Sequence, residues 1–430
     1  MVELILLAFA TGGGLMVALG WRQRSELARA WVAAAEQCRL EGATLRRRAG
    51  WVTSLDARRG PLFVELAIVR PKDLVQPATR IAIHGLPPDF ELRREDPDDA
   101  LTPMRRRGRV PVGDDRFDVN ISIEGERLQA LALLDATTRE RARAVFFGGQ
   151  PRSERVYHGL EKRKLHVGLS RGRLVVERYA GYSPQVLAQS LAEALTFAEG
   201  LLVEGPLEAR LAANVRGDPE PGVRLNNLRE LLAVSPRHPA TREALEAALA
   251  DGDEQVQLEA AIALGSEGRA TLLDIASRGW SADACSARAV QELRSALPVE
   301  QARAILAHAL RTRLLETAAA CVESLSRRGP EDADTFARVL ALEHGGLAAA
   351  AARALGRVGG VSAVATLVEA QRRLSGDEEF RRVAREAIAA IQSRTSGALP
   401  GQLSLAGGQA GQVSLSRDET GRVSLDDAKR

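Results

Sequence analysis

The sequence predicts an α+β domain followed by an all-α solenoid, with a transmembrane helix before them and a disordered tail after them. Ala-rich amphipathic segments recur about every 30 residues over residues 222–394. Apolar and polar residues alternate in short runs between turn residues over residues 41–203. An uncharged apolar run occupies residues 4–21. With 430 residues, the chain is long enough for two or three folded units.

The clearest repeats are five Ala-rich helices, which end near Gly265, Ala296, Gly329, Gly360 and Gln392. A larger apolar residue recurs near each helix end, with an alanine about one turn earlier; the pairs are Leu264 and Ala261, Leu293 and Ala289, Leu325 and Ala319, Leu355 and Ala351, and Ile391 and Ala387. Small residues let neighbouring helices approach closely, and larger ones fill the seam between them. We therefore expect a solenoid of about five helix pairs, a scaffold that favours a binding function.

These repeats resemble HEAT repeats, specifically the short, phycobilisome-lyase-type HEAT-like repeats. The best match is Asp251-Gly252-Asp253 ahead of "EQVQLEAAIALG", an acidic cap after a short turn and an Ala-Leu-Gly ending. Ala282-Asp283 and Gly376-Asp377 keep the acidic start, whereas Arg311-Thr312 and Gly345-Gly346 depart from it. The resemblance covers about 40% of the chain and implies a concave recognition surface. It carries no lyase activity over to this chain.

The run at residues 4–21 contains no charge and would span roughly 27 Å as a helix, just enough to cross a bilayer. Arg22, Arg24 and Arg29 follow it, no Lys or Arg precedes it, and Glu3 is acidic. The positive-inside rule then places the bulk of the chain in the cytoplasm, as a single-pass protein of the inner (plasma) membrane. A secretory signal peptide cleaved after Ala18-Leu19-Gly20 is the alternative, although the basic region that precedes such peptides is missing.

A juxtamembrane helix is predicted over residues 22–40, because Leu27, Trp31, Ala35 and Cys38 recur at helical spacing. Strands are predicted at "GWVTSLDA", "LFVELAIV", "ATRIAIHGL", "FELRRE" and "RFDVNISIEG", then a helix over residues 126–147. A hairpin turning at Ser170-Arg171-Gly172 follows, and a helix running from Pro184 to Val203 closes the region. This α+β unit resembles a domain of uncharacterised bacterial membrane-anchored proteins, and the resemblance brings no known activity.

The region from Arg22 to Ala180 is basic, with 31 Lys and Arg against 22 Asp and Glu. Arg22, Arg24 and the run Arg46, Arg47 and Arg48 are candidates for contact with an anionic membrane surface. Charge that keeps a strand edge soluble explains the Arg46 to Arg48 run equally well. Arg105 to Arg109 lie in a Pro-flanked loop without aromatic residues to stack bases, so nucleic acid binding is disfavoured.

The sequence carries no recognisable catalytic, metal-binding or cofactor-binding motif, so we predict no enzyme activity, no cofactor and no metal. Its three cysteines, Cys38, Cys285 and Cys321, are dispersed, and its six histidines show no i, i+4 pair. Cys285 and Cys321 fall on Ala-rich helix faces and are interpreted as small buried hydrophobes. Asp96, Asp98 and Asp99 are dense enough for a cation, but the prolines beside them favour a solvated loop.

The tail, residues 395–430, is predicted to be disordered, yet it repeats a pentapeptide, G-x-(L/V)-S-L, every ten residues. The apolar positions are candidate partner-binding residues: Leu403, Leu405, Val413, Leu415, Val423 and Leu425. In a strand the two apolar residues of each unit lie on one face, which suits a peptide that adds to a sheet edge, such as an exposed edge near residues 62–69. A tandem duplication without a ligand is the alternative.

Together these features favour a membrane-anchored scaffold or adaptor that binds protein partners through the solenoid and contacts the lipid bilayer through its N-terminal helix. The alternative is an enzyme, or an anion- or nucleic-acid-binding protein, with its site in the basic α+β domain. A pocket with converging polar groups of perturbed pKa would favour the enzyme, and a groove along the solenoid helices would favour the scaffold.

We expect the chain to fractionate with the inner membrane, because an uncharged run at residues 4–21 precedes the arginine cluster at Arg22, Arg24 and Arg29. Protease added from outside should leave the solenoid intact, as immunoblotting of treated spheroplasts would show. A mature protein that begins at Trp21 in an extracytoplasmic fraction would contradict this topology.

Overall fold

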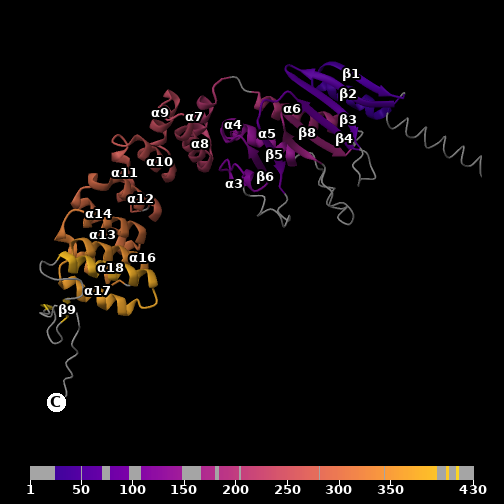
Figure 1. Ribbon diagram of the computed structural model, residues 1–430. Helices are drawn as coiled ribbons and strands as arrows, with labels where there is room; N and C mark the ends of the chain where they lie inside the picture. The colour runs from indigo at the N-terminus through magenta and orange to yellow at the C-terminus, as the bar shows by residue number, and fades with distance from the viewer. Residues whose placement is uncertain are drawn as a thin grey trace, which may run out of the picture. The chain divides into compact units, whose positions relative to one another are not determined.

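The computed structural model describes residues 25–49, 51–69, 78–95, 108–147, 166–179, 184–202, 205–279, 281–342, 344–394, 403–405 and 413–415 (Figure 1). The chain divides into two compact units, Met1–Ala247 and Ala248–Arg430. The first is an α+β unit built on an antiparallel sheet. The second is helical and has its own hydrophobic core, which runs from Leu258 to Ile391.

The sheet of the first unit has eight strands, in the order β1-β2-β3-β4-β8-β7-β5-β6, and every pair is antiparallel. Their bounds are β1 Glu41–Arg48, β2 Trp51–Arg59, β3 Leu62–Val69, β4 Ala78–His84, β5 Phe90–Arg94, β6 Ile121–Gly125, β7 Val167–Ser170 and β8 Arg173–Tyr179. The hairpin expected around Ser170-Arg171-Gly172 is therefore β7–β8.

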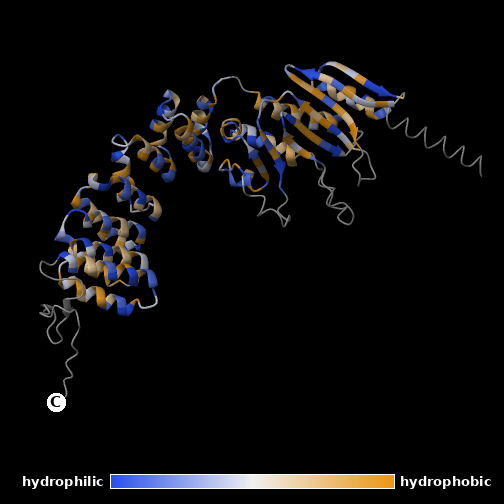
Figure 2. Ribbon diagram, in the orientation of Figure 1, coloured by the Kyte–Doolittle hydropathy of each residue, from blue (hydrophilic) through white to orange (hydrophobic). Residues whose placement is uncertain are grey.

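Alternation along the strands separates a covered face of the sheet from a polar one. Val64 lies opposite Ile83, and Leu66 lies opposite Ile81, which in turn faces Val176; all five are buried. Figure 2 shows hydrophobic residues concentrated on the middle strands. Helix α6 (Pro184–Leu201) contacts β4 and β8, and α5 (Ala136–Phe147) contacts β7. These helices cover the apolar face of the sheet.

A helix of residues 25–37 precedes β1, and the four residues that the sequence places on one face of it, Leu27, Trp31, Ala35 and Cys38, are all buried. The helix is tied to the sheet unit just beyond its end. The Cys38 thiol donates to the carbonyl oxygen of Ala188 at 3.5 Å, and Arg59 donates to that of Cys38 at 3.0 Å. The segment after the predicted membrane helix is therefore part of the folded α+β unit.

Two local predictions differ from the structure, and in both an aspartate starts a helix. "RFDV" is not strand: α3 (Asp115–Asp118) begins at Asp114, whose carboxylate accepts from the Phe117 N–H at 3.1 Å. The helix expected over residues 126–147 is broken into α4 (Arg127–Leu133) and α5. Asp135 stands between them and accepts from the Thr138 N–H at 2.7 Å. Such caps cannot be predicted from apolar alternation or from helical periodicity.

The edge strand expected near residues 62–69 is wrong, because β3 pairs with β2 on one side and β4 on the other. Among the described strands of this sheet, β1 and β6 are outermost. The outer edge of β6 is partly occupied, since Arg109 bridges Glu124 and the Val110 N–H donates to the Ile123 carbonyl at 3.0 Å. No described residue pairs with the outer edge of β1.

Helices α7 (Leu207–Gly217), α8 (Pro221–Val234) and α9 (Pro239–Ala248) follow the sheet. Helices α7 and α8 pack against each other and against α4. The solenoid was predicted to start at residue 222, within α8, whereas the contacts group α7 and α8 with the sheet.

The second unit is a stack of helices: α10 Glu254–Leu264, α11 Arg269–Ser277, α12 Asp283–Leu293, α13 Val299–Thr312, α14 Leu315–Ser326, α15 Ala333–Leu340, α16 Gly345–Val358, α17 Ser362–Arg373 and α18 Glu378–Arg394. The five Ala-rich segments are the even-numbered helices. Each even helix contacts the next even helix, and α11, α13, α15 and α17 each pack against the even helix that follows. This arrangement is compatible with an α-solenoid.

The residues predicted to form the seam are mostly in the core. Of the ten, eight are buried, while Leu264 and Ala319 are half-buried. Helices α16 and α18 approach closely: a β-carbon added to Gly356 would lie 2.9 Å from both Cα and Cβ of Ala387. Small residues are thus required there, as the repeat pattern predicts.

The even helices also cap one another. Helix ends leave N–H and C=O groups unsatisfied. The Asp283 carboxylate of α12 accepts from the Glu316 and Thr317 N–H groups of α14 at 3.0 and 2.8 Å. At the opposite helix ends, Arg328 donates to the Arg294 carbonyl at 3.1 Å and Arg394 to the Gly359 carbonyl at 2.9 Å. These polar bonds fix the register between neighbouring repeats.

Gly356→Ala should destabilise the helical unit by about 1–2 kcal/mol, because overpacking against Ala387 outweighs the gain in helix propensity. Gly346→Ala is the matched control: no atom lies within 4 Å of the added β-carbon, so this change should stabilise by up to about 1 kcal/mol. Thermal and urea unfolding measure both. Equal shifts for the two variants would show that α16 and α18 are not in contact at Gly356.

Candidate functional site

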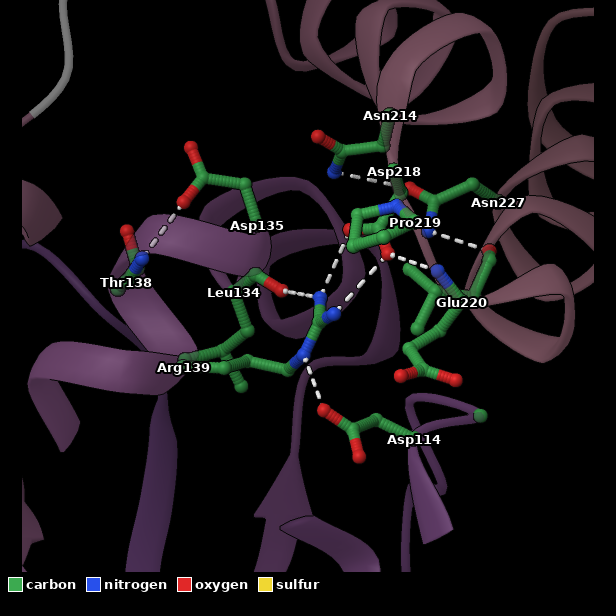
Figure 3. Close-up of polar contacts among 12 residues, drawn as sticks. Asp114, Leu134, Asp135, Thr138, Arg139, Asn214, Asp218, Pro219, Glu220 and Asn227 are labelled. Atoms are coloured by element: carbon green, nitrogen blue, oxygen red, sulfur yellow. Dashed lines mark hydrogen bonds and ion pairs between the residues drawn. The ribbon is translucent and has the colours of Figure 1, made fainter. Parts of the chain in front are cut away.

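Among the described residues, a concentrated group of buried charges surrounds Arg139, in the first turn of α5 (Figure 3). Its side chain is 2% exposed and forms a two-pronged ion pair with Asp218, with nitrogen–oxygen distances of 2.9 and 3.0 Å. Its Nε donates to Asp114 at 3.0 Å, and Nη1 also donates to the Leu134 carbonyl at 2.9 Å. Asp114 begins α3, and Asp218 follows the last turn of α7.

Further contacts bring the same segments together. Arg143 donates to both carboxylate oxygens of Asp114 at 3.0 Å. The Asn214 side chain of α7 donates to the Leu131 carbonyl of α4 at 3.0 Å. The backbone at Gly113, before α3, is also in contact with the backbone at Gly222 of α8: a β-carbon on Gly113 would lie 2.3 Å from the carbonyl carbon of Gly222. Gly113 has a φ of +98°. Only glycine adopts this backbone conformation readily and also fits against Gly222 without a clash.

The charges of this cluster are matched. Burial opposes the charge on Arg139, but the hydrogen bonds and charges of Asp218, followed by those of Asp114, outweigh it and raise the guanidinium pKa. Burial also raises the pKa of Asp118, against the N–H donors of Gly113 and Val112. The buried nitrogen and oxygen atoms of Arg139, Asp114 and Asp218 all have hydrogen-bond partners. We therefore interpret the cluster as a structural junction that joins the sheet to α7 and α8.

A groove lined largely by charged residues lies on the helical unit, between α12 and α14, with a volume of about 640 Å³. Four arginines and two glutamates line this α12–α14 groove: Arg288, Arg294, Arg327, Arg328, Glu292 and Glu323. The glutamates are already paired, Glu292 with Arg288 at 2.9 Å and Glu323 with Arg353 at 3.3 Å. Ser324 also lines the groove, and its buried Oγ has no hydrogen-bond partner within the described ranges.

The groove has an excess of positive charge. Arg294 and Arg327 are exposed and make no ion pair within the described part of the chain. Arg328 donates only to backbone carbonyls, those of Arg294 and Leu297. Guanidinium groups that face solvent beside a concave surface are suited to carboxylates, which they bind through two parallel hydrogen bonds.

A second groove, of about 480 Å³, lies between the helix of residues 25–37 and strands β1 and β2. Its apolar lining residues are Ala28, Val32, Ala33, Leu45, Trp51 and Val52. Arg29, Glu36 and Arg47 stand around them. We refer to it as the β1 groove, because Leu45 and Arg47 belong to the outermost strand.

The structure places three of the five predicted membrane-surface arginines on β1. Arg46 forms an ion pair with Asp56, Arg47 lines the β1 groove, and Arg48 is exposed at the end of the strand. Arg22 and Arg24 lie outside the described residues. In the other basic segment, Arg109 is paired with Glu95 at 2.6 Å, and Arg105 to Arg107 are not described.

The first two tail repeats pair with each other. Strands β9 (Leu403–Leu405) and β10 (Val413–Leu415) are antiparallel, with Leu405 opposite Val413 and Leu403 opposite Leu415. The sequence predicts addition of these repeats to another sheet, and their pairing with each other was not predicted. The third repeat, with Val423 and Leu425, lies outside the described residues.

All three cysteines are buried, which confirms the interpretation of Cys285 and Cys321. Burial raises the pKa of the Cys285 thiol to about 11 and that of Cys321 to about 12, so neither is a thiolate at neutral pH. The described residues contain no group of three or more His, Cys, Asp or Glu side chains that could hold a metal ion.

Within the described ranges, no helix is long and apolar enough to cross a bilayer. The predicted membrane helix at residues 4–21 falls outside them.

Nothing matches this chain in comparisons with protein families, with curated proteins and with solved structures.

Neither arginine feature was predicted from the sequence, in which the arginine runs of the α+β domain are more conspicuous. Three of the four groove arginines, Arg294, Arg327 and Arg328, lie instead at the ends of Ala-rich helices. The signal was available: Arg294, Arg328, Arg357 and Arg394 recur near the ends of successive even helices. Arg139 gave no such signal, because its aspartate partners are 25 and 79 residues away in the chain.

Arg139→Ala should destabilise the first unit by about 3–5 kcal/mol, because it leaves the Asp218 carboxylate buried without its partner. Arg143→Ala should cost about 1 kcal/mol or less, since that side chain is 28% exposed. Chemical unfolding of both variants measures the difference. Adding Asp114→Asn and Asp218→Asn to Arg139→Leu should recover part of the loss. Equal stabilities of the two single variants would contradict the junction.

Proposed function

We propose that this protein is a scaffold or adaptor without catalytic activity, whose helices α10–α18 form a HEAT-like solenoid that binds a protein partner. The observation that carries the proposal is the α12–α14 groove, which lies on the row of even helices and has two arginines, Arg294 and Arg327, without ion-pair partners among the described residues. Solenoids recognise partners through the surface formed by one row of helices. The partner segment is acidic on this account.

The composition of the groove favours a peptide over nucleic acid. No aromatic residue lines it, so it offers no stacking platform for bases. Its two glutamates are already paired with Arg288 and Arg353, which leaves Arg294 and Arg327 as the cations that a partner's carboxylates would reach. A volume of about 640 Å³, open along two helices, suits side chains of an extended or helical segment.

The same geometry supports binding over catalysis. An acid–base pair needs groups free to exchange protons with a substrate, whereas both glutamates of the groove are held by arginines. The enzyme alternative places a site in the α+β unit, where the most buried charges, at Arg139, are saturated by one another.

Attachment to the inner membrane through residues 4–21 is also part of the proposal, with the bulk of the chain in the cytoplasm. It is supported by the uncharged apolar run and by the arginines that follow it. Because the helix of residues 25–37 belongs to the α+β unit, such an anchor would hold that unit close to the bilayer surface.

Reversing the free charges, with Arg294→Glu and Arg327→Glu together, should reduce partner capture at least tenfold, because acidic side chains would then meet like charge. The measurement is quantitative crosslinking capture by the full chain from its native cells. The control is Arg338→Glu with Arg372→Glu, two exposed arginines on α15 and α17. It adds the same charge and should leave capture unchanged.

Partners lost with the groove variant should be enriched in acidic segments, and their binding should weaken as salt is raised. Undiminished capture by a folded groove variant, or equal losses from both double variants, would contradict the proposal.

A further inference from the structure

Strand β1 offers an open edge that the sheet itself leaves unpaired. Its inner side pairs with β2, and none of the described residues pairs with its outer side. The other outermost strand, β6, is partly covered by Arg109 and Val110. An open edge exposes N–H and C=O groups that can pair with an added strand.

The β1 groove is lined partly by this edge strand. Leu45 and Arg47 of β1 line it together with Val32 and Ala33 of the helix of residues 25–37. A groove between an edge strand and a helix is the arrangement in which an added peptide pairs its backbone with the strand and places alternate side chains in the groove. Trp51 and Val52 add apolar surface.

The edge strand β1 also has features that limit its pairing with other strands. The pairing of β1 with β2 has irregularities between Glu41 and Thr44 and between Arg46 and Arg47. Such bulges and a run of arginines discourage indiscriminate pairing. Arg47 and Arg48 make no ion pair within the described ranges. A strand that carries carboxylates would pair with these two arginines, whereas their charge disfavours basic strands.

One segment of this chain has the required features. The repeat unit already forms strands, since β9 and β10 are its first two copies and pair with each other. The third copy, Gly-Arg-Val-Ser-Leu at residues 421–425, is followed at once by Asp426 and Asp427. Val423 and Leu425 alternate with a serine, so a strand would place both on one side. The first two copies have no acidic residue directly after them.

We propose that the third tail repeat of a second copy of this chain adds as a strand to the outer edge of β1, with Val423 and Leu425 in the β1 groove and Asp426 and Asp427 near Arg47 and Arg48. The interaction links copies of the protein and is independent of the α12–α14 groove. A chain attached to a membrane would meet its neighbours in two dimensions, where even a weak link is effective.

Fluorescence anisotropy with a labelled peptide of residues 419–428 tests the proposal. The receptor is the full chain with Leu405→Asp, Leu415→Asp and Leu425→Asp, so that its own tail does not compete. We expect saturable binding of one peptide per chain. A peptide with Val423→Asp and Leu425→Asp should bind at least tenfold more weakly. A peptide with Asp426→Asn and Asp427→Asn should bind several-fold more weakly than the unmodified peptide. This difference in affinity should become smaller at high salt.

On the receptor side, Ala33→Glu places a charge in the groove and should reduce affinity at least tenfold. Gln37→Glu adds the same charge to the exposed end of the same helix and is the control. Sedimentation should show concentration-dependent self-association of the wild-type chain and monomers of the chain with the three tail substitutions.

Three results would overturn the proposal. One is no saturable binding at peptide concentrations up to about 1 mM, which includes the case in which residues 1–24 already occupy the groove. Another is equal binding of the peptide with Val423→Asp and Leu425→Asp, a comparison that needs no receptor variant. The third is undiminished binding by a folded Ala33→Glu chain.

Discussion

The first unit depends on one buried guanidinium. Arg139 holds Asp114 at the start of α3 and Asp218 at the end of α7, so three segments distant in sequence meet around a single side chain (Figure 3). A buried ion pair contributes little net stability, because desolvation opposes the attraction. It does specify geometry, since neither aspartate tolerates burial without the arginine. The close backbone contact between Gly113 and Gly222 also depends on α8 lying against the segment before α3. Helices α7 and α8 are thereby fixed to the sheet.

The helical unit is held together differently. Its even helices approach through small residues, as at Gly356 and Ala387, and cap one another through Asp283, Arg328 and Arg394. Arginines used as caps lie along the ends of the even helices, and Arg294 and Arg327 lie among them without ion-pair partners in the described residues. The repeat that builds the stack therefore also supplies the positive charge of the α12–α14 groove.

Periodicity predicted most of the fold because burial on one face enforces it. The strands from Trp51 to Arg94, the β7–β8 hairpin and the five Ala-rich helices all follow from alternation or helical spacing. The misplaced elements, α3 and the break between α4 and α5, begin at aspartates whose capping role depends on local backbone geometry. The order of the strands, and hence the open edge at β1 instead of β3, depends on contacts between distant segments. The Arg139 cluster lay beyond sequence reasoning for the same reason.

Native-state hydrogen exchange, followed residue by residue through increasing denaturant, tests most directly whether Arg139 joins α7 and α8 to the sheet. The account predicts that amides of α7 and α8 open together with those of β4 and β8, at one free energy. It also predicts that amides of α12, α14 and α16 open in a separate transition. If α7 and α8 instead open with the helices beyond Ala248 while the sheet stays closed, they belong to the helix stack, and the junction at Arg139 does not unite the first unit.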